Sequence, residues 1–354
     1  MVFCKNNLEF FGLDISDLSL KIVGVRKKKN ITSLVFLGAW SIPSGIITKG
    51  EINNENKLVE VIKQGLGKVS GEKINTKYVG VSLPEEKSFL DVFQIPILPE
   101  EEIENVIRQE AENNIPFPLN EVYFDFERLG QQDKKLEYQE VFSVACSKKI
   151  VDSYERVLKR VGLKPLFMEV ESLAVARSIM KYGVLSDPVL IIDFGENRTS
   201  FIIFAGRHVR FTSTISVSAR QLTRSIANDL KIDFRKAETM KREQGLYGDK
   251  KVFESMTPLL ANLAQQIKSH LNYYHSHRPK ETPPYLKKKI DKILLCGGGS
   301  NLKGLGEFLT SELKIDVSCG DAFVNIQNQK ISISKGQSLG FSTAIGLALR
   351  KNGN

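Results

Sequence analysis

The stretch VLIIDFGENRTS at residues 189–200 decides the fold. It begins as an apolar run with the length of a buried strand, and it ends in Asp193, a glycine and a short polar turn. The stretch EFFGLDISDLS at residues 9–19 has the same order, because an apolar strand reaches Asp14 and a polar turn follows it. The chain therefore carries one strand–aspartate–turn pattern twice.

Further elements follow each turn in the same order. Apolar periodicity predicts the elements of the first half at residues 9–15, 19–26, 31–40, 58–69 and 78–81, and the fourth of these is a helix. The second half is predicted at residues 189–193, 200–204, 208–215, 218–230 and 292–296, again with a helix in the fourth place. A mainly helical insert is expected at residues 232–290. The sequence thus predicts an α/β fold of two duplicated halves.

The first half has a different insert at residues 88–162. Pro99 and the three glutamates after it are a typical helix start, since proline fits the first turn and acidic side chains favour the positive end of the helix dipole. Two strands at 121–128 and 136–146 are predicted next, and then a helix that Gly162 closes. This order predicts a small inserted subdomain.

The two aspartate turns suit phosphate chemistry. An aspartate at the end of a buried strand can hold a hydrated Mg²⁺, and a turn rich in small polar residues offers N–H and O–H groups to phosphate oxygens. Each turn taken alone is equally an ordinary β-turn. The repetition of the turn in both halves favours a phosphate clamp.

Three glycines, Gly297–Gly299, follow the last predicted strand of the second half. Glycines allow a flat ring or a ribose to approach the backbone, and Ser300 or Asn301 is expected to cap a following helix. The pattern matches neither the P-loop nor the G-x-G-x-x-G dinucleotide motif. A tight strand-to-helix turn is the structural alternative.

Composition excludes several classes of protein. With 354 residues, 42% hydrophobic and 26% charged, the chain is typical of a globular protein with two cores. Its four cysteines are scattered, which disfavours zinc and a disulfide framework, and the three histidines at 270, 275 and 277 are expected on the surface. No signal peptide, membrane span or membrane-binding tail is expected, so the predicted location is the cytoplasm.

The positions of Asp14, Asp193 and Gly297–Gly299 resemble the actin/Hsp70-like ATPase superfamily. Residues 169–176 and 342–348 are similar to the two small-residue helices that connect the halves of that fold. The segment from Arg235 to Lys241 resembles the A-E-x-x-K segment beside the adenosine. Within the superfamily, the chain resembles the PilM family of type IV pilus assembly over essentially its whole length.

Particular marks of that family are Gly12-Leu13-Asp14, Ile115-Pro116-Phe117 and the closing segment at residues 344–350. FtsA, the related cell-division protein, is disfavoured because its C-terminal membrane-targeting helix is not found here. The resemblance implies subdomain 1A at 1–87, an FtsA-type 1C at 88–162, a return to 1A at 163–187, 2A at 188–231, 2B at 232–290, 2A again at 291–337, and a return to 1A at 338–354.

The resemblance also implies ATP or ADP with Mg²⁺ in the interdomain cleft. Asp14 and Asp193 are expected near the metal, which they would hold through water molecules, and Glu171 is expected either to orient water or to have a packing or capping role. The implied nucleotide-binding residues are Asp14, Ser16, Asp17, Ser19, Lys21, Asp193, Gly195, Glu196, Asn197, Thr199, Glu238, Lys241, Gly297, Gly298, Gly299, Ser300 and Asn301.

The first turn departs from the family pattern. PilM relatives usually read D-I-G-S-S-S-x-K, whereas this chain has Ser16, Asp17 and Leu18 in the turn between Asp14 and Lys21. The lost glycine restricts the turn, and Asp17 places an anion where a terminal phosphate is expected. We therefore expect weak or absent ATPase activity, and a higher ATP affinity for Asp17→Ser.

The implied partner is the N-terminal cytoplasmic peptide of a PilN-type inner-membrane protein, bound in a groove between 1A and 1C near residues 89–96 and 100–118. Other pilus platform or motor proteins are also implied, with only an indirect link to the inner membrane. A net charge of +9, spread along the chain, fits work beside an anionic membrane better than nucleic-acid binding. A small-molecule kinase and a polymer-forming ATPase on the same fold remain alternatives, and self-association is left open.

Overall fold

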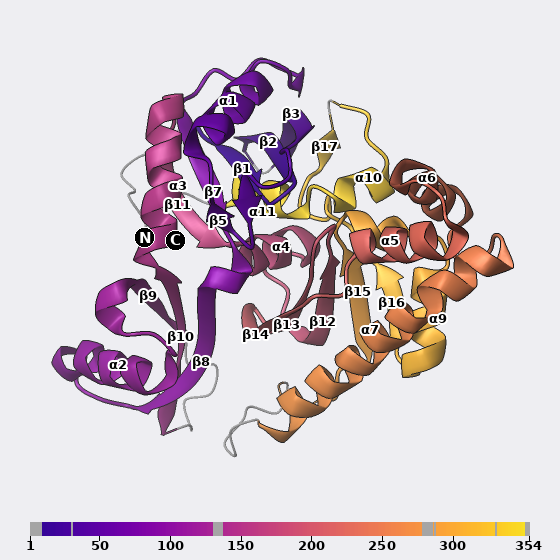
Figure 1. Cartoon of the computed structure of the whole chain (residues 1–354). Helices are drawn as coiled ribbons and strands as arrows, with labels where there is room; N and C mark the ends of the chain where they lie inside the picture. The colour runs from indigo at the N-terminus through magenta and orange to yellow at the C-terminus, as the bar shows by residue number, and fades with distance from the viewer. Residues whose placement is uncertain are drawn as a thin grey trace. The chain divides into compact units, whose positions relative to one another are not determined.

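The strand–aspartate–turn pattern at residues 9–19 forms the hairpin of β1 (Phe11–Ile15) and β2 (Ser19–Lys28). The computed structural model describes residues 9–29, 31–129, 137–277, 286, 288–329 and 331–350. The chain divides into two compact units. Their helices and strands are labelled in Figure 1. Unit 1 comprises Met1–Ala174, Asn328–Ile331 and Ala344–Asn354, and unit 2 comprises Val175–Gln327 and Ser332–Thr343.

The sheet of unit 1 has the strand order β11-β7-β1-β2-β3-β17, with β6 paired to β3. Strands β1, β7 and β11 run parallel, and the other long strands are antiparallel. Helices α1 (Glu55–Leu66) and α3 (Lys148–Val161) pack their apolar residues on one face. The remaining strands are β3 (Ile31–Ser41), β6 (Ser70–Gly71), β7 (Tyr78–Leu83), β11 (Lys164–Val170) and β17 (Asn328–Gln329).

Unit 2 repeats this arrangement. Its hairpin joins β12 (Ser186–Phe194) to β13 (Thr199–Gly206), and the sheet order is β14-β13-β12-β15-β16. The order β15-β12-β13-β14 therefore corresponds to β7-β1-β2-β3, which confirms the predicted duplication. The other elements are β14 (His208–Ile215), α5 (Ala219–Leu230), α6 (Phe234–Gln244), α7 (Lys250–Ser276), β15 (Lys292–Cys296), α9 (Leu305–Leu313), β16 (Asp316–Cys319) and α10 (Lys335–Leu339).

The insert of unit 1 is a three-stranded antiparallel sheet in the order β8-β10-β9, with α2 (Glu100–Asn114) on one face. Its strands are β8 (Ser88–Pro96), β9 (Val122–Leu129) and β10 (Tyr138–Ser147). Ile103 and Ile107 of α2 pack on Phe93, Ile95 and Val141 of the sheet. The predicted helix-and-strand order of this insert is confirmed.

Helix α11 (Ser342–Leu349) packs unusually closely against its neighbours in unit 1. A Cβ atom built on Gly346 would overlap the carbonyl oxygen of Ala174 in α4 (Glu171–Ile179). A Cβ atom built on Gly12 of β1 would overlap the carbonyl oxygen of Ala344. Only glycine fits at these two positions, because backbone atoms occupy the space of the side chain.

Two predictions about local structure are wrong. Ser300 and Asn301 do not cap a helix, because Gly298–Asn301 is a 3-10 turn and α9 begins at Leu305 behind Gly304, whose φ is 85°. His270 is not a simple surface histidine, since its Nε2 lies 2.9 Å from Ser213 Oγ and its ring packs on Phe201. No helix in the described part of the chain is long and apolar enough to cross a membrane.

We expect Gly346→Ala to destabilise unit 1 by at least about 2–3 kcal/mol, because the new methyl group overpacks against backbone that cannot move independently. The matched control is Gly67→Ala, since Gly67 has φ −84° and the nearest atom to a new Cβ, its chain neighbours apart, is the Gln64 carbonyl oxygen at 3.9 Å. Urea unfolding of both variants checks this. Equal midpoints for the two variants would contradict the close-packing argument.

Candidate functional site

The candidate residues of unit 1 lie where its parallel strands end. Asp14, near the end of β1, is 3% exposed, and its Oδ2 forms an ion pair with Lys21 Nζ at 3.2 Å. Ser82 of β7 donates from Oγ to Asp14 Oδ1 at 3.1 Å and accepts from the N–H of Ile15 at 3.1 Å. Ser82 was not predicted, because nothing in its own strand distinguishes it from a core residue.

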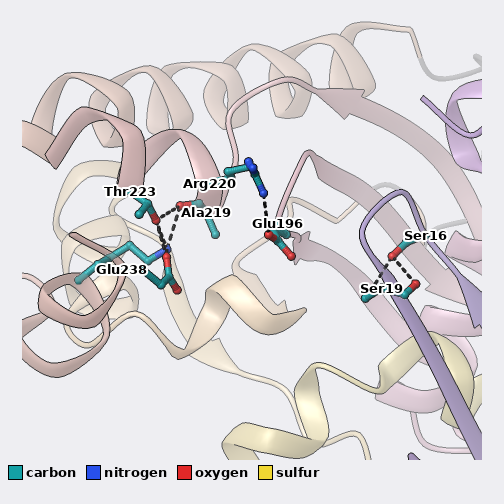
Figure 2. A network of polar contacts seen from close by, with 8 residues as sticks. Ser16, Ser19, Glu196, Ala219, Arg220, Thr223 and Glu238 are labelled. Carbon is teal, nitrogen blue, oxygen red and sulfur yellow. Dashed lines mark hydrogen bonds and ion pairs between the residues drawn. The ribbon is translucent and has the colours of Figure 1, made fainter. Parts of the chain in front are cut away.

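The turn after Asp14, which we call loop 1 (Ser16–Ser19), is closed by its own hydrogen bonds. Ser16 donates its N–H to the Ser19 carbonyl at 2.9 Å, and the Ser16 and Ser19 hydroxyl oxygens are 2.8 Å apart (Figure 2). Leu18 accepts from the N–H of Ile42 at 2.8 Å. These contacts give the turn a fixed shape although the family glycine is missing.

Asp17 has contacts that the sequence did not predict. Its Oδ2 accepts the N–H of Lys49 at 2.9 Å, and its Oδ1 accepts the N–H of Gly50 at 3.0 Å. The carboxylate therefore already has two backbone donors in unit 1. Asp17→Ser would therefore also free the backbone N–H groups of residues 49 and 50, and its effect on ATP affinity stays a prediction.

Glu171 follows β11 directly and is the first residue of α4. It is buried, and its place in the first turn also suits the positive end of the helix dipole. Glu85, buried as well, accepts the N–H of Ser172 through Oε2 at 3.3 Å. The structure thus brings a second carboxylate, unpredicted from the sequence, to the start of α4.

In unit 2, the second aspartate turn and the three glycines lie side by side. Strands β12 and β15 are parallel neighbours, and Asp193 is paired with Cys296 in the register. Gly297 has φ 81°, and a Cβ atom there would overlap Asp193 Oδ1. No described atom lies within 4 Å of a Cβ built on Gly298. The glycines therefore let the two turns approach each other, and Gly298 faces open space.

The turn after Asp193, which we call loop 2 (Gly195–Thr199), is held by the start of α5. Gly195 donates to the Arg198 carbonyl at 2.9 Å, while the carbonyls of Gly195 and Glu196 accept from Ala219 and Arg220. Glu196 also forms an ion pair with Arg220 at 3.3 Å (Figure 2). Glu196 and Asn197 are exposed at the tip of loop 2.

Thr199 lies apart from the exposed tip. It is fully buried, and its hydroxyl donates to the Val217 carbonyl at 2.6 Å. The expectation that this hydroxyl faces a phosphate needs correction, because the side chain points into the core where β13 begins.

Glu238 and Lys241 share one face of α6, as their spacing predicts, and form an ion pair at 2.7 Å. The Lys241 ammonium also donates to Thr223 Oγ1 at 2.7 Å and to the Ala219 carbonyl at 2.9 Å. Its three protons thus have three acceptors in unit 2. Burial lowers the pKa of Lys241, and the hydrogen bond that Lys241 donates to Glu238 opposes that shift.

Helix α10 forms hydrogen bonds with the segment that contains the three glycines, residues 297–301. Asn301 donates its side-chain amide to the carbonyls of Gly336, at 2.9 Å, and Gly298, at 3.2 Å. Gly297 donates its N–H to the Leu339 carbonyl at 3.0 Å, and Ser300 donates Oγ to the Gly297 carbonyl at 2.6 Å. Ser300 and Asn301 therefore shape the segment, and α10 is a part of the site that sequence reasoning missed.

Each unit by itself carries one strand-end aspartate of the kind that holds a metal through water. Among the described residues, no group of three or more His, Cys, Asp or Glu side chains is arranged to hold an ion. Asp14 and Asp193 each offer a single carboxylate at a strand end, which suits Mg²⁺ because that ion keeps several of its waters. Direct ligation by protein alone does not fit.

Comparisons with known proteins define the fold class. A solved structure of the PilM-PilN type IV pilus biogenesis complex matches with a TM-score of 0.80 and 26% identity, covering 97% of this chain and 98% of the solved one. MreB5 of Spiroplasma citri bound to ADP matches with a TM-score of 0.53 and 13% identity, covering 94% of both chains. The fold is therefore that of the actin-like ATPases.

The sequence comparisons narrow this class. The cell division protein FtsA of Streptococcus pneumoniae is 21% identical over 332 residues, which cover 84% of this chain and 72% of the relative. The sequence model of the family described as "Type IV pilus assembly protein PilM" matches residues 12–352. The chain belongs to this PilM family.

We expect Glu238→Gln to lower the free energy of unfolding at pH 7 by about 1 kcal/mol, because the buried Lys241 loses its charged partner while Glu238 itself is partly exposed. Since burial lowers the pKa of Lys241 below 10.5, the unfolded chain binds more protons at alkaline pH and stability rises with pH there.

In Glu238→Gln this rise should begin at a lower pH, because the bond that opposed the pKa shift is gone. Urea unfolding from pH 7 to 10 measures both effects, and Glu243→Gln, exposed on the same helix, is the control. Identical pH profiles for wild type and Glu238→Gln would count against a buried Lys241 charge.

Proposed function

We propose that the chain is a cytoplasmic, nucleotide-binding scaffold of the type IV pilus inner-membrane platform that binds the N-terminal peptide of a PilN-type protein. Membership of the PilM family is the observation that carries this proposal. The similarity to the PilM-PilN complex, at 26% identity, supports the PilN-type partner. Attachment to the membrane is then indirect, through the partner.

ATP or ADP is the nucleotide we propose. In unit 2, loop 2 serves the phosphates and Gly297–Gly299 serve the adenosine, with Gly298 open to the ligand. In unit 1, Asp14 with Lys21 and loop 1 supplies the corresponding phosphate-binding group. In each unit, the aspartate at the strand end, Asp14 or Asp193, would hold Mg²⁺ through water, and the ion would neutralise phosphate charge when bound.

The contacts within loop 1 are consistent with slow or absent ATP hydrolysis. The hydroxyls of loop 1 are bonded to each other, so they are not aimed outward as a preorganised phosphate cradle. Glu171 is the residue that orients water if hydrolysis occurs, and its buried place at the start of α4 serves packing equally well. Nucleotide binding is thus proposed as a structural signal rather than as a catalytic cycle.

The insert of unit 1 offers a face for the peptide. Leu90 and Val92 of β8 lie beside Val144 and Phe142 of β10, on the face of the sheet opposite α2, and all four are partly exposed. The same face continues to Tyr123 and Cys146, which pack against the main core of unit 1. This apolar face is where we place the groove between the 1A and 1C subdomains.

The charge of the insert indicates the character of the peptide. Residues 88–147 contain 13 Asp and Glu against 4 Lys and Arg, although the whole chain has a net charge of +9. Asp125 and Glu127 of β9 are paired with Val144 and Phe142 on the face just described. A peptide that combines basic with apolar side chains therefore complements this face best.

Gly298→Val tests the nucleotide proposal. No described atom lies within 4 Å of a Cβ at this position, so the fold should be retained within about 1 kcal/mol, while the side chain extends into the space proposed for the nucleotide. Isothermal titration with Mg-ATP and with Mg-ADP should show at least a tenfold loss of affinity. If the variant keeps both the nucleotide affinity and the thermal stability of wild type, the nucleotide does not bind at Gly297–Gly299.

Val92→Glu tests the peptide proposal. A negative charge in the apolar face should weaken binding of the PilN-type N-terminal peptide at least tenfold, measured by titration calorimetry. Val184→Glu is the matched control, because Val184 is an exposed apolar residue of unit 2. If the wild-type chain binds the peptide but no nucleotide, the scaffold function stands and the nucleotide proposal fails. Release of ADP that depends on a sugar would instead favour the alternative of a small-molecule kinase.

A further inference from the structure

The hairpin of β4 (Ile47–Thr48) and β5 (Glu51–Ile52) contacts loop 1 on one side and the attachment points of the acidic insert on the other. We call these attachment points the stems. The first stem is residues 84–88, where the chain enters β8, and the second is residues 147–149, where it leaves β10 for α3. Loop 1, the hairpin and both stems all belong to unit 1.

The contact with loop 1 depends on the shape of the hairpin turn. Lys49 and Gly50 have φ values of 49° and 76°, so their successive N–H groups point to one side of the turn. Such a pair of N–H groups binds an anion, and the two oxygens of Asp17 accept one bond each. A serine or asparagine at position 17 cannot accept both bonds in this way.

The opposite side of the turn is packed against the first stem and α3. A Cβ atom on Gly50 would lie 2.5 Å from the Cβ atom of Pro84, so the backbone of the turn lies directly on the first stem. The buried Tyr154 of α3 donates its hydroxyl to the Gly50 carbonyl at 3.2 Å. The turn therefore has little room to move unless the stems move with it.

Glu51, the next residue, joins the two stems. Its Oε1 accepts from Lys87 Nζ at 2.7 Å, directly before β8, and its Oε2 accepts from Lys149 Nζ at 3.3 Å, directly after β10. Both hydrogen bonds lower the pKa of Glu51, with the Lys87 bond the larger cause. One carboxylate thus links the entry and the exit of the insert.

We propose that Asp17 is a positioning residue that fastens the 47–52 hairpin to loop 1, so that a ligand at loop 1 changes the peptide affinity of the acidic insert. The two ligands are those of the proposed function, on which this part of the inference rests. The mechanical link from loop 1 through residues 49–51 to both stems is independent of any ligand. By linkage, the peptide changes the affinity for the nucleotide by the same factor.

Hydrogen exchange of the whole chain tests the mechanical link without ligands. Asp17→Asn should speed exchange at the amides of Lys49 and Gly50, and also at residues 85–90 and 145–149. Glu60→Gln, an exposed carboxylate on α1, is the control and should leave all of these unchanged. Faster exchange confined to residues 49 and 50 would overturn the link, because the stems would then be independent of Asp17.

Calorimetric titration of the PilN-type N-terminal peptide, with and without saturating Mg-ADP, tests the coupling. Wild type should show at least a fivefold difference in peptide affinity. Glu51→Gln, which lies outside loop 1, should show a ratio near one while both ligands still bind, and Asp17→Asn should show a ratio near one at an ADP concentration that saturates that variant. Equal ratios in wild type and both variants would overturn the coupling. If wild type binds neither ligand, the proposed function fails, and the exchange experiment alone decides the link.

Discussion

The parallel pairing of β1 with β7, and of β12 with β15, is the constraint on which the functional loops depend. Parallel neighbours end at the same edge of a sheet, so whatever follows each strand is brought to that edge. Asp14 therefore meets Ser82, and Asp193 meets Gly297. Neither meeting can be arranged by an antiparallel hairpin alone, because a hairpin joins only consecutive strands.

Glycine allows these close contacts where neighbouring atoms leave no room for a side chain. Gly297 stands against Asp193, and Gly12 and Gly346 let α11 lie on β1 and α4. A side chain at any of these glycines would displace a neighbouring carbonyl or carboxylate, and the loops that follow would move with it.

The charged residues in or near the proposed nucleotide loops already have polar partners in the folded chain. Asp14, Asp17 and Lys241 are charged groups in or near the proposed nucleotide loops, and each has partners within its own unit. They therefore shape the loops before any ligand arrives, which is the preorganisation that binding sites require. The acidic insert differs, because its charge excess is gathered over one small sheet and suits a basic partner.

The sequence by itself determined the duplicated α/β fold and the insert, because strand periodicity and the aspartate turns are local patterns. The nucleotide-binding residues follow from the family resemblance and stay a prediction. The sequence could not determine that Asp17 binds the turn at Lys49 and Gly50, or that Glu85 reaches α4, since these pairs are far apart along the chain. It also misplaced Thr199 and the helix after Gly299, where neighbouring strands and α10 decide the direction of the backbone. Only tertiary packing fixes such contacts, because their energy depends on which segments the sheets bring together.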